Sequence, residues 1–269
     1  MSIATVNGIK LSFEEYGSRD GDPVVLITGS GGRGRMWTPY QVPALTAAGY
    51  RVITLDNRGV PPSDTGPAGF TIEDMAADTA GLIKYLGLNA CRVVGFSMGG
   101  IIVLELLLAY PDLVTQAVLM AARGRTDTFA AAFVAAGSEL LDSGITLPPR
   151  YAAVVQAMQY LSPRTLTNEQ RVRDWLDIFE MSPEDSSISR AQRDLDLIDN
   201  RLEECRKIKS RCLVVGFQDD LVVSPQLCRE ISASIPDCKY EEIPGCGHYG
   251  YLEEPEAVNS AILKFFQGA

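Results

Sequence analysis

Two glycines flank a serine at a spacing that suits nucleophilic chemistry: Gly95, Ser97 and Gly99 follow one apolar run and precede another. A serine at a tight turn between a strand and a helix projects its hydroxyl out of the sheet, where the oxygen can attack a carbonyl carbon. Glycine at both positions removes side chains that would collide in such a turn. The next amide, that of Met98, would lie at a helix N-terminus, where unpaired N–H groups favour an anion. We therefore predict that Ser97 is a nucleophile.

A serine hydroxyl needs a base, and the chain contains a single histidine, His248. Imidazole is the side chain best suited to accept a proton near neutral pH. One histidine cannot supply a histidine-rich zinc site or a two-histidine iron site in a monomer. We therefore expect His248 to be the general base, and we expect neither a metal ion nor an organic cofactor.

The third group of such a site is a carboxylate that orients the imidazole and stabilises its protonated form. Two adjacent aspartates, Asp219 and Asp220, follow the apolar run Cys212–Phe217. The residue types alone do not choose between them.

Alternating apolar runs and helical segments must position these groups. The predicted strands are Val24–Thr28, Arg51–Leu55, Arg92–Phe96, Ala117–Ala121, Cys212–Phe217 and Lys239–Ile243, and the predicted helices include Ile72–Leu86, Met98–Tyr110, Pro225–Ile235 and Pro255–Phe266. This alternation predicts an α/β fold with a mostly parallel, doubly wound sheet. Because the carboxyl ends of parallel strands share one edge, we expect Ser97, His248 and the aspartate pair to converge there.

Local motifs add detail to this fold. The dipeptide Asn7-Gly8 between Ile3–Val6 and Ile9–Tyr16 predicts an N-terminal antiparallel hairpin, because a type I′ turn needs positive φ at both central residues. The segment Thr71–Asp74 resembles a capping box and predicts a helix start. A further helix is expected to begin near Trp37.

The strand–helix alternation stops between residues 123 and 206. This region has helical composition over Phe129–Leu141, Tyr151–Leu161 and Gln170–Glu180, and a polar interruption at Ser182–Ser189. We interpret residues 123–206 as a helical lid inserted into a core domain of residues 1–122 and 207–269. A separate helical domain is the alternative.

The composition limits partners and compartment. The 269 residues are 46% hydrophobic and carry a net charge of −10, which suits a globular protein and argues against a nucleic-acid partner. The start of the chain lacks a secretory signal, and no apolar run approaches the ~20 residues that span a bilayer. We therefore expect a cytoplasmic protein without a membrane partner, in which the six cysteines are reduced packing residues.

The chain resembles the α/β-hydrolase family over nearly its whole length. The matching segments are the loop Gly29–Gly34, the segment Asp56–Gly59, the turn Gly95–Gly99, the pair Asp219-Asp220 and the pair Gly247-His248. Their order, serine then acid then histidine, is that of the family. The family's acid loop often ends in Val-Pro, which Val223-Ser224-Pro225 resembles, and this match favours Asp220 over Asp219. Some relatives carry the acid at the position of Asp127, which makes it a third candidate.

The resemblance also implies an oxyanion hole. One amide comes from the residue after the nucleophile and another from the first glycine-rich loop, which implies Met98 and Ser30, with Gly31 as the alternative. Relatives commonly have His-Gly where this chain has Thr28-Gly29, but the backbone amides survive that change. Residues expected to line an apolar substrate pocket are Gly31, Trp37, Phe96, Tyr151, Trp175 and Tyr249.

The activity that the resemblance implies is that of a serine hydrolase, an esterase or lactonase, that cleaves an ester, lactone or thioester of a small apolar molecule through an acyl-enzyme. The segment Arg92–Ala121 is most similar to enol-lactonases and haloperoxidase-like esterases. One alternative is C–C bond hydrolysis, because Gly29–Gly32 resembles the loop of meta-cleavage-product hydrolases. Others are lyase, dehydratase or cyclase chemistry on the same scaffold, and a ligand-binding protein without catalysis. The sequence leaves the oligomeric state open, a homodimer included.

Overall fold

An eight-stranded sheet crosses the molecule in the computed structural model, which describes residues 1–181, 192, 195 and 197–268. The strand order is β1-β2-β4-β3-β5-β6-β7-β8. The strands are β1 (Ser2–Val6), β2 (Ile9–Tyr16), β3 (Pro23–Ile27), β4 (Arg51–Leu55), β5 (Cys91–Phe96), β6 (Val114–Met120), β7 (Arg211–Phe217) and β8 (Cys238–Ile243). β1 and β2 run antiparallel to their neighbours, and the other neighbouring pairs are parallel. The predicted α/β fold with its N-terminal antiparallel hairpin is confirmed.

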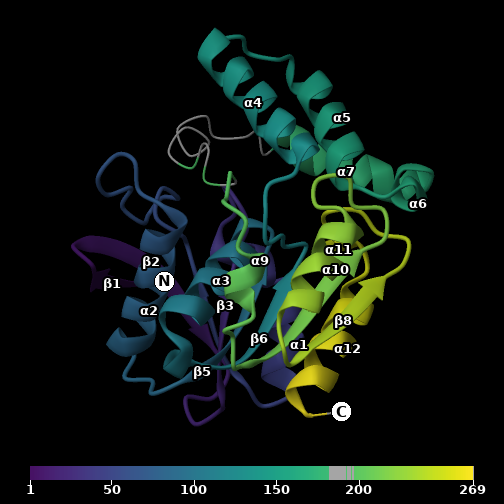
Figure 1. Ribbon diagram of the computed structural model, residues 1–269. Coiled ribbons are helices and arrows are strands. Elements are labelled where there is room, and N and C mark those ends of the chain that lie inside the picture. Colours follow the sequence, from purple (N-terminus) through teal and green to yellow (C-terminus); the bar gives the residue numbers. More distant parts are fainter. Residues whose placement is uncertain (182–191, 193–194, 196, 269) are drawn as a thin grey trace.

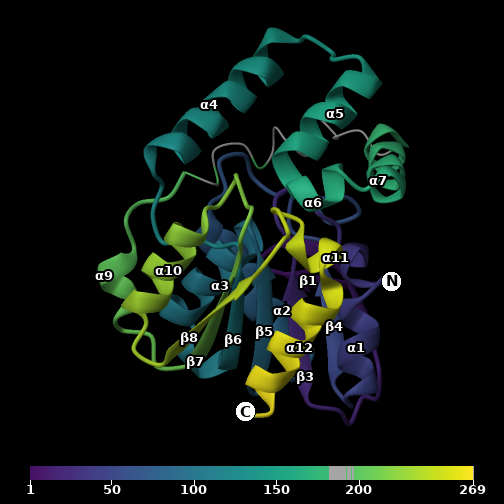
Figure 2. The ribbon, with the colours of Figure 1, turned by 90° about the vertical axis from the view of Figure 1, so that its right-hand side faces the viewer.

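Helices cover both faces of this sheet (Figure 1). α3 and α10 lie on one side of it, and α1 and α12 lie on the other (Figure 2). The helices of the sheet domain are η1 (Gly34–Trp37), α1 (Gln41–Ala47), α2 (Ile72–Tyr85), α3 (Met98–Ala109), η2 (Pro111–Leu113), α9 (Leu202–Cys205), α10 (Pro225–Ser234), α11 (Gly250–Glu253) and α12 (Pro255–Phe266). Because both faces are covered, residues 24–27 of β3 form a continuous run of Val, Leu and Ile whose side chains are fully buried.

The local motifs have the expected geometry, with one exception. Asn7 and Gly8 both adopt positive φ, 48° and 78°, in the turn of the hairpin. Thr71 and Asp74 form a reciprocal capping box at the start of α2. The prediction of a helix beginning near Trp37 is wrong: Trp37 ends a 3-10 turn, and α1 begins at Gln41. Pro39 explains this break, because it has no N–H with which to continue the turn.

A buried ion pair joins the loop after β4 to α2. Arg58 donates to the two carboxylate oxygens of Asp78 over 2.5 and 2.7 Å, and both side chains are buried. Asn7 donates a further hydrogen bond to Asp78 over 3.0 Å, so the hairpin turn is tied to the same carboxylate. A buried charge pair that is supported by a further hydrogen bond fixes the packing of the elements that hold it.

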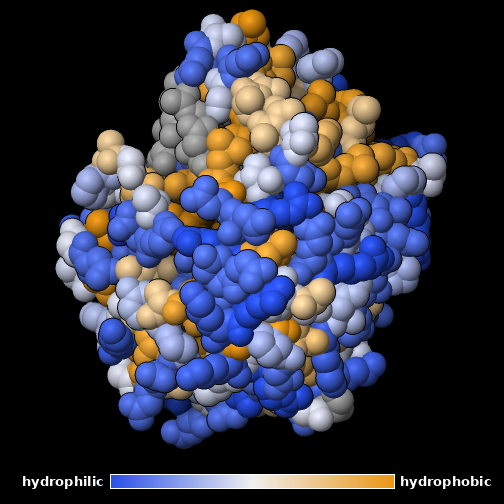
Figure 3. All heavy atoms as spheres, in the orientation of Figure 1, coloured by the Kyte–Doolittle hydropathy of each residue, from blue (hydrophilic) through white to orange (hydrophobic). Residues whose placement is uncertain are grey.

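Four helices lie across the carboxyl ends of the parallel strands (Figures 1 and 2). They are α4 (Thr128–Ser143), α5 (Pro149–Tyr160), α6 (Pro163–Leu166) and α7 (Glu169–Met181). These four helices and the turns between them are called the lid below. α4, α5 and α7 fall on the predicted helical segments, α6 was not predicted, and the polar stretch Ser182–Ser189 lies outside the described residues. Hydrophobic residues gather on the surface of this end of the molecule, whereas hydrophilic ones dominate the sheet domain in the same view (Figure 3).

The cysteines are packing residues, as expected. All six are free thiols, and five of them are buried. Burial raises the pKa of the Cys91 and Cys205 thiols to about 12, which keeps them protonated and unreactive near neutral pH. None of the helices that the structure describes combines the length and the apolar character needed to cross a bilayer.

Candidate active site

Ser97 occupies a strained turn between β5 and α3. Its φ of 53° and ψ of −122° lie outside the backbone regions that residues other than glycine ordinarily adopt. The backbone is held there by a hydrogen bond from the Ser97 amide to the Met120 carbonyl, 2.9 Å, and by the Ser97 carbonyl, which accepts from Gly100 over 2.8 Å. The turn has the geometry that the glycine–serine spacing predicts.

The flanking glycines are required by close backbone contacts. A Cβ on Gly95 would lie 2.2 Å from the Gly99 carbonyl oxygen, and one on Gly99 would lie 2.3 Å from the Ile27 carbonyl oxygen. These distances are too short for any side chain, because the obstacles are backbone atoms that cannot move aside. β3, β5 and α3 therefore pack at a distance that only glycine permits.

His248 and Asp220 lie beside the serine. His248 Nε2 is 3.1 Å from Ser97 Oγ, and His248 Nδ1 is 2.8 Å from Asp220 Oδ2. The other carboxylate oxygen of Asp220 accepts from the amides of Val222 and Val223 over 2.8 and 2.9 Å. Asp220 and His248 are both buried, with 4% exposure each. The carboxylate favours the tautomer in which Nδ1 carries the proton and Nε2 can accept one from the serine.

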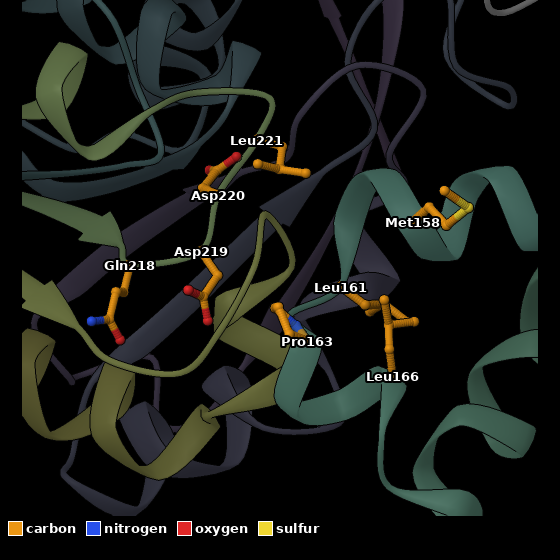
Figure 4. A pocket seen from close by; sticks show the side chains of 8 residues that line it. All are labelled: Met158, Leu161, Pro163, Leu166, Gln218, Asp219, Asp220 and Leu221. Carbon is orange, nitrogen blue, oxygen red and sulfur yellow. The ribbon is translucent and has the colours of Figure 1, made fainter.

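The two other acid candidates lie elsewhere. The Asp219 side chain points toward a surface cavity (Figure 4), and its amide donates to the Cys246 carbonyl over 2.9 Å. Asp127 is the N-cap of α4, where its side chain accepts from the Ala130 amide over 2.8 Å. Of the three carboxylates considered from the sequence, the structure brings Asp220 into contact with His248.

A cysteine near the histidine does not compete with the serine. Cys246 is fully buried, and this burial raises the pKa of its thiol well above the usual value. A protonated, inaccessible thiol is a poor nucleophile.

The residues predicted to form the oxyanion hole differ in whether their backbone amides already donate a hydrogen bond. Met98 is the first residue of α3, so its amide has no partner within the helix. The Gly31 amide donates to the side-chain oxygen of Gln192 over 2.7 Å. That engagement removes Gly31 as an oxyanion donor in this structure and leaves the amides of Met98 and Ser30 as the candidate pair.

Gln192 was missed from the sequence. Its side chain is buried, accepts from Gly31, and donates to the Arg58 carbonyl over 2.9 Å, so it joins the glycine-rich loop to the loop after β4. The contact spans 161 residues along the chain, and nothing local to Gln192 predicts it.

The six predicted pocket residues lie in different surroundings. Phe96 contacts the His248 ring at a centroid distance of 4.9 Å, and Gly31 is held by Gln192. Trp37 is fully buried in the core, whereas Tyr151 is 59% exposed. The remaining two, Trp175 and Tyr249, contact one another at 5.9 Å where the lid packs against the histidine loop.

A cavity of about 380 Å³ opens between the lid and the acid loop (Figure 4). Its lining residues are Met158, Leu161, Pro163, Leu166, Gln218, Asp219, Asp220 and Leu221. The lid contributes the apolar side chains of α5 and α6, and the loop after β7 contributes the polar ones. Within the residues described, no cluster of three or more His, Cys, Asp or Glu side chains could hold a metal ion.

Comparisons with known proteins agree with this architecture. A Mycobacterium tuberculosis protein with the provisional name non-heme bromoperoxidase BpoC is 48% identical over 96% of this chain and 98% of its own length, and its crystal structure superposes with a TM-score of 0.91 over 96% of each chain. A Variovorax paradoxus protein provisionally named carbamate hydrolase RutD is 31% identical over 95% of both chains. The enol-lactonase of Burkholderia xenovorans shares the fold, with a TM-score of 0.82 at 24% identity over 99% of this chain and 100% of its own.

Residues 22–255 match the family described as the alpha/beta hydrolase fold. This match covers most of the chain and contains Ser97, Asp220 and His248. The protein therefore belongs to the alpha/beta hydrolase family and is an enzyme of the hydrolase type.

Proposed function

We propose that this protein is a serine hydrolase that cleaves the ester, lactone or thioester bond of a small apolar molecule through an acyl-enzyme. The observation that carries the proposal is the continuous contact from Ser97 Oγ through His248 to Asp220, at 3.1 and 2.8 Å. Those distances are within hydrogen-bond reach, as proton transfer from the nucleophile to the base requires.

In the proposed mechanism, Ser97 Oγ attacks the carbonyl carbon while His248 Nε2 takes the hydroxyl proton. The carbonyl oxygen becomes an oxyanion, which the amides of Met98 and Ser30 stabilise. Asp220 stabilises the imidazolium that forms and does not itself take the proton. The imidazolium then protonates the leaving oxygen or sulfur, which departs and leaves the acyl group on Ser97.

Water completes the cycle. His248 Nε2 removes a proton from the water molecule as it attacks the acyl carbon. When the second tetrahedral intermediate collapses, the imidazolium gives that proton to Ser97 Oγ, and the carboxylic acid leaves. The same two amides face the oxyanion in both halves. The aromatic rings beside His248, those of Phe96, Tyr160 and Tyr249, support a largely apolar substrate.

A fluorophosphonate probe tests the nucleophile. We expect stoichiometric labelling of the wild type and none of Ser97→Ala, because the probe reacts with a serine activated by a base. Ser143→Ala, which changes an exposed lid serine, is the control and should label as the wild type does. Absence of labelling in the wild type, or equal labelling of Ser97→Ala, contradicts the proposal.

A substrate panel then separates the bond types. Aryl esters, lactones, aryl carbamates and vinylogous diketones differ in the atom that leaves the carbonyl carbon. Faster turnover of an ester or lactone than of the diketone supports the proposed class, whereas the reverse order indicates C–C hydrolysis. Activity that survives in Ser97→Ala indicates lyase, dehydratase or cyclase chemistry instead.

A second candidate follows from the name of the 48% identical relative, a non-heme bromoperoxidase. Hydrogen peroxide in place of water would attack the acyl-enzyme, giving a peracid and free Ser97. The peracid would then oxidise bromide to hypobromous acid and return to the carboxylic acid. Bromination of monochlorodimedone in the presence of acetate, peroxide and bromide measures this activity, and it should disappear in Ser97→Ala.

A further inference from the structure

Glu253 is a buried carboxylate that the proposed mechanism does not use. It lies at the end of α11 with 3% exposure. One of its oxygens accepts from the Ser162 amide and hydroxyl over 3.0 and 2.8 Å, and the other accepts from the Gly247 amide over 2.6 Å. A buried carboxylate is costly unless donors such as these satisfy it, which makes the arrangement specific.

The two ends of this bridge belong to different parts of the molecule. Ser162 is the N-cap of α6 in the lid, where its hydroxyl also accepts from the Thr165 amide over 3.2 Å. Gly247 directly precedes His248 in the loop after β8. A single side chain therefore holds the lid to the backbone of the histidine.

A second contact fixes the other side of the histidine. The Tyr249 amide donates to the Tyr160 carbonyl at the end of α5, over 3.0 Å. The Tyr160 ring stacks on Tyr249 with a centroid distance of 4.9 Å and lies 5.9 Å from the His248 ring. The amides on both sides of His248 are thus held by acceptors that lie in the lid or are bonded to it.

The segments approach too closely for this contact to be incidental. A Cβ on Gly247 would lie 2.7 Å from the Leu161 carbonyl carbon and 2.8 Å from the Tyr160 carbonyl oxygen. Only glycine permits the histidine loop to lie against the α5–α6 junction at this distance. The position of that junction and the position of His248 are consequently coupled.

We propose that Glu253 is a positioning residue that couples the position of the α5–α6 junction to the alignment of His248 with Ser97 and Asp220. It acts through the Gly247 amide and does not touch the reacting atoms. A displacement of about 1 Å in a catalytic group can lower the rate about 100-fold. Loss of the hydrogen bond from Gly247 to Glu253 can therefore lower kcat. The inference rests on the proposed role of His248 as the base.

The single histidine makes a direct test possible, because histidine labelled with ¹⁵N gives one imidazole in the NMR spectrum. Glu253→Gln removes one acceptor oxygen and places an NH₂ group against backbone donors. We expect the Nδ1 proton signal of His248 to shift or broaden in this variant. With an aryl ester, we expect kcat to fall about 10- to 100-fold while KM changes less than about threefold.

Glu254→Gln is the matched control. Glu254→Gln removes the same charge at the next position. The Glu254 carboxylate contacts the lid arginines Arg164 and Arg171 at 3.2 and 3.6 Å. We expect it to leave the His248 signal and kcat as in the wild type. Ser162→Ala keeps the Ser162 amide donor and removes one of the three hydrogen bonds to Glu253, together with the cap to the Thr165 amide. Its effect on the His248 signal and on kcat should therefore fall between those of the two glutamine variants.

The outcomes are distinguishable. A Glu253→Gln protein with a lower melting temperature but a wild-type His248 signal, kcat and pH profile overturns the proposal and leaves Glu253 a structural role. A change in KM alone overturns it as well, because it places the effect on the lid without the histidine. If Glu253→Gln does not fold, the His248 signal of Ser162→Ala decides. The NMR measurement needs no substrate, so it stands apart from failure of the proposed hydrolysis.

Discussion

The sheet domain and the lid differ in how completely they bury their apolar side chains. In the sheet domain, one continuous cluster of buried side chains extends through β1–β8 and the flanking helices. In the described part of the lid, the second cluster holds Ala153, Ala157, Leu161 and Phe179. Large apolar side chains of the lid instead remain exposed, among them Phe129, Tyr151, Met158, Ile178 and Met181.

This difference separates two tasks. The turns that follow β5, β7 and β8 carry Ser97, Asp220 and His248. Because these turns begin at strands of one sheet, the distances between the three side chains are well defined. The lid supplies apolar side chains to the cavity and is joined to the sheet domain by contacts that include those of the buried Glu253. We infer that the sheet domain determines whether the chemistry occurs and that the lid determines which molecule undergoes it.

The largest expected effect comes from His248→Ala. This change removes the base and its proton relay but leaves the sheet and the lid in place, so kcat should fall about 10⁴- to 10⁶-fold. Steady-state turnover of an aryl ester measures the loss, and circular dichroism checks that the fold persists. Turnover near that of the wild type would show that the chemistry depends on another base.

The next largest effect separates the two aspartates. Asp220→Asn keeps an oxygen for the Val222 and Val223 amides but stabilises the wrong tautomer of the imidazole, so kcat should fall about 10³- to 10⁴-fold. Asp219, one residue away, lines the cavity. Asp219→Asn should lower kcat less than tenfold, and any further effect should be on KM. A greater loss in Asp219→Asn than in Asp220→Asn would reverse the assignment.

Ion pairs sharpen the comparison of the two regions. Arg58→Met leaves Asp78 buried without its charged partner in the sheet domain, which should lower the free energy of unfolding by about 3–5 kcal/mol. Arg150→Met breaks the exposed lid pair with Glu180 and should cost less than about 1 kcal/mol. Urea unfolding of both variants measures the difference, and equal losses would contradict the contrast between sheet and lid.

Two leucines make the same comparison through apolar packing, with a smaller upper difference than the catalytic variants show. Leu26→Ala in β3 creates a cavity in the fully buried core and should cost about 2–5 kcal/mol of unfolding free energy. Leu140→Ala in α4 changes a side chain that is 39% exposed and should cost less than about 1 kcal/mol. The same urea experiment applies, and a lid variant as damaging as the core variant would show that the lid is packed more tightly than the structure indicates.

Features with a local cause could be predicted from the sequence. Asn7-Gly8 forms its turn because two adjacent residues accept positive φ, and α2 begins at Thr71 because its own third neighbour completes the cap. The elbow at Ser97 depends on glycines two residues away on either side. The convergence of Ser97, His248 and the Asp219-Asp220 pair needed only the additional rule that parallel strands end at one edge, whereas the preference for Asp220 came from the resemblance of its loop to that of the family.

Features that depend on distant contacts could not be predicted. Gln192 meets Gly31 across 161 residues, and Glu253 meets Ser162 across 91. Aromatic character alone did not distinguish Trp37, which is buried in the core, from Tyr151, which is exposed on the lid. Whether such a side chain contacts substrate depends on how the lid packs, and the strand–helix pattern carries no information about that packing.

The central claim is that Ser97 carries the acyl group between the two halves of the reaction. An aryl N,N-dimethylcarbamate tests it most directly, because its carbamoyl-enzyme hydrolyses slowly enough to be isolated. The account predicts one equivalent of released phenol per chain and a carbamoyl group on the peptide that contains Ser97, seen by mass spectrometry. Full turnover of aryl esters with Ser97 unmodified by the carbamate, or a carbamoyl group on a different side chain, would contradict it.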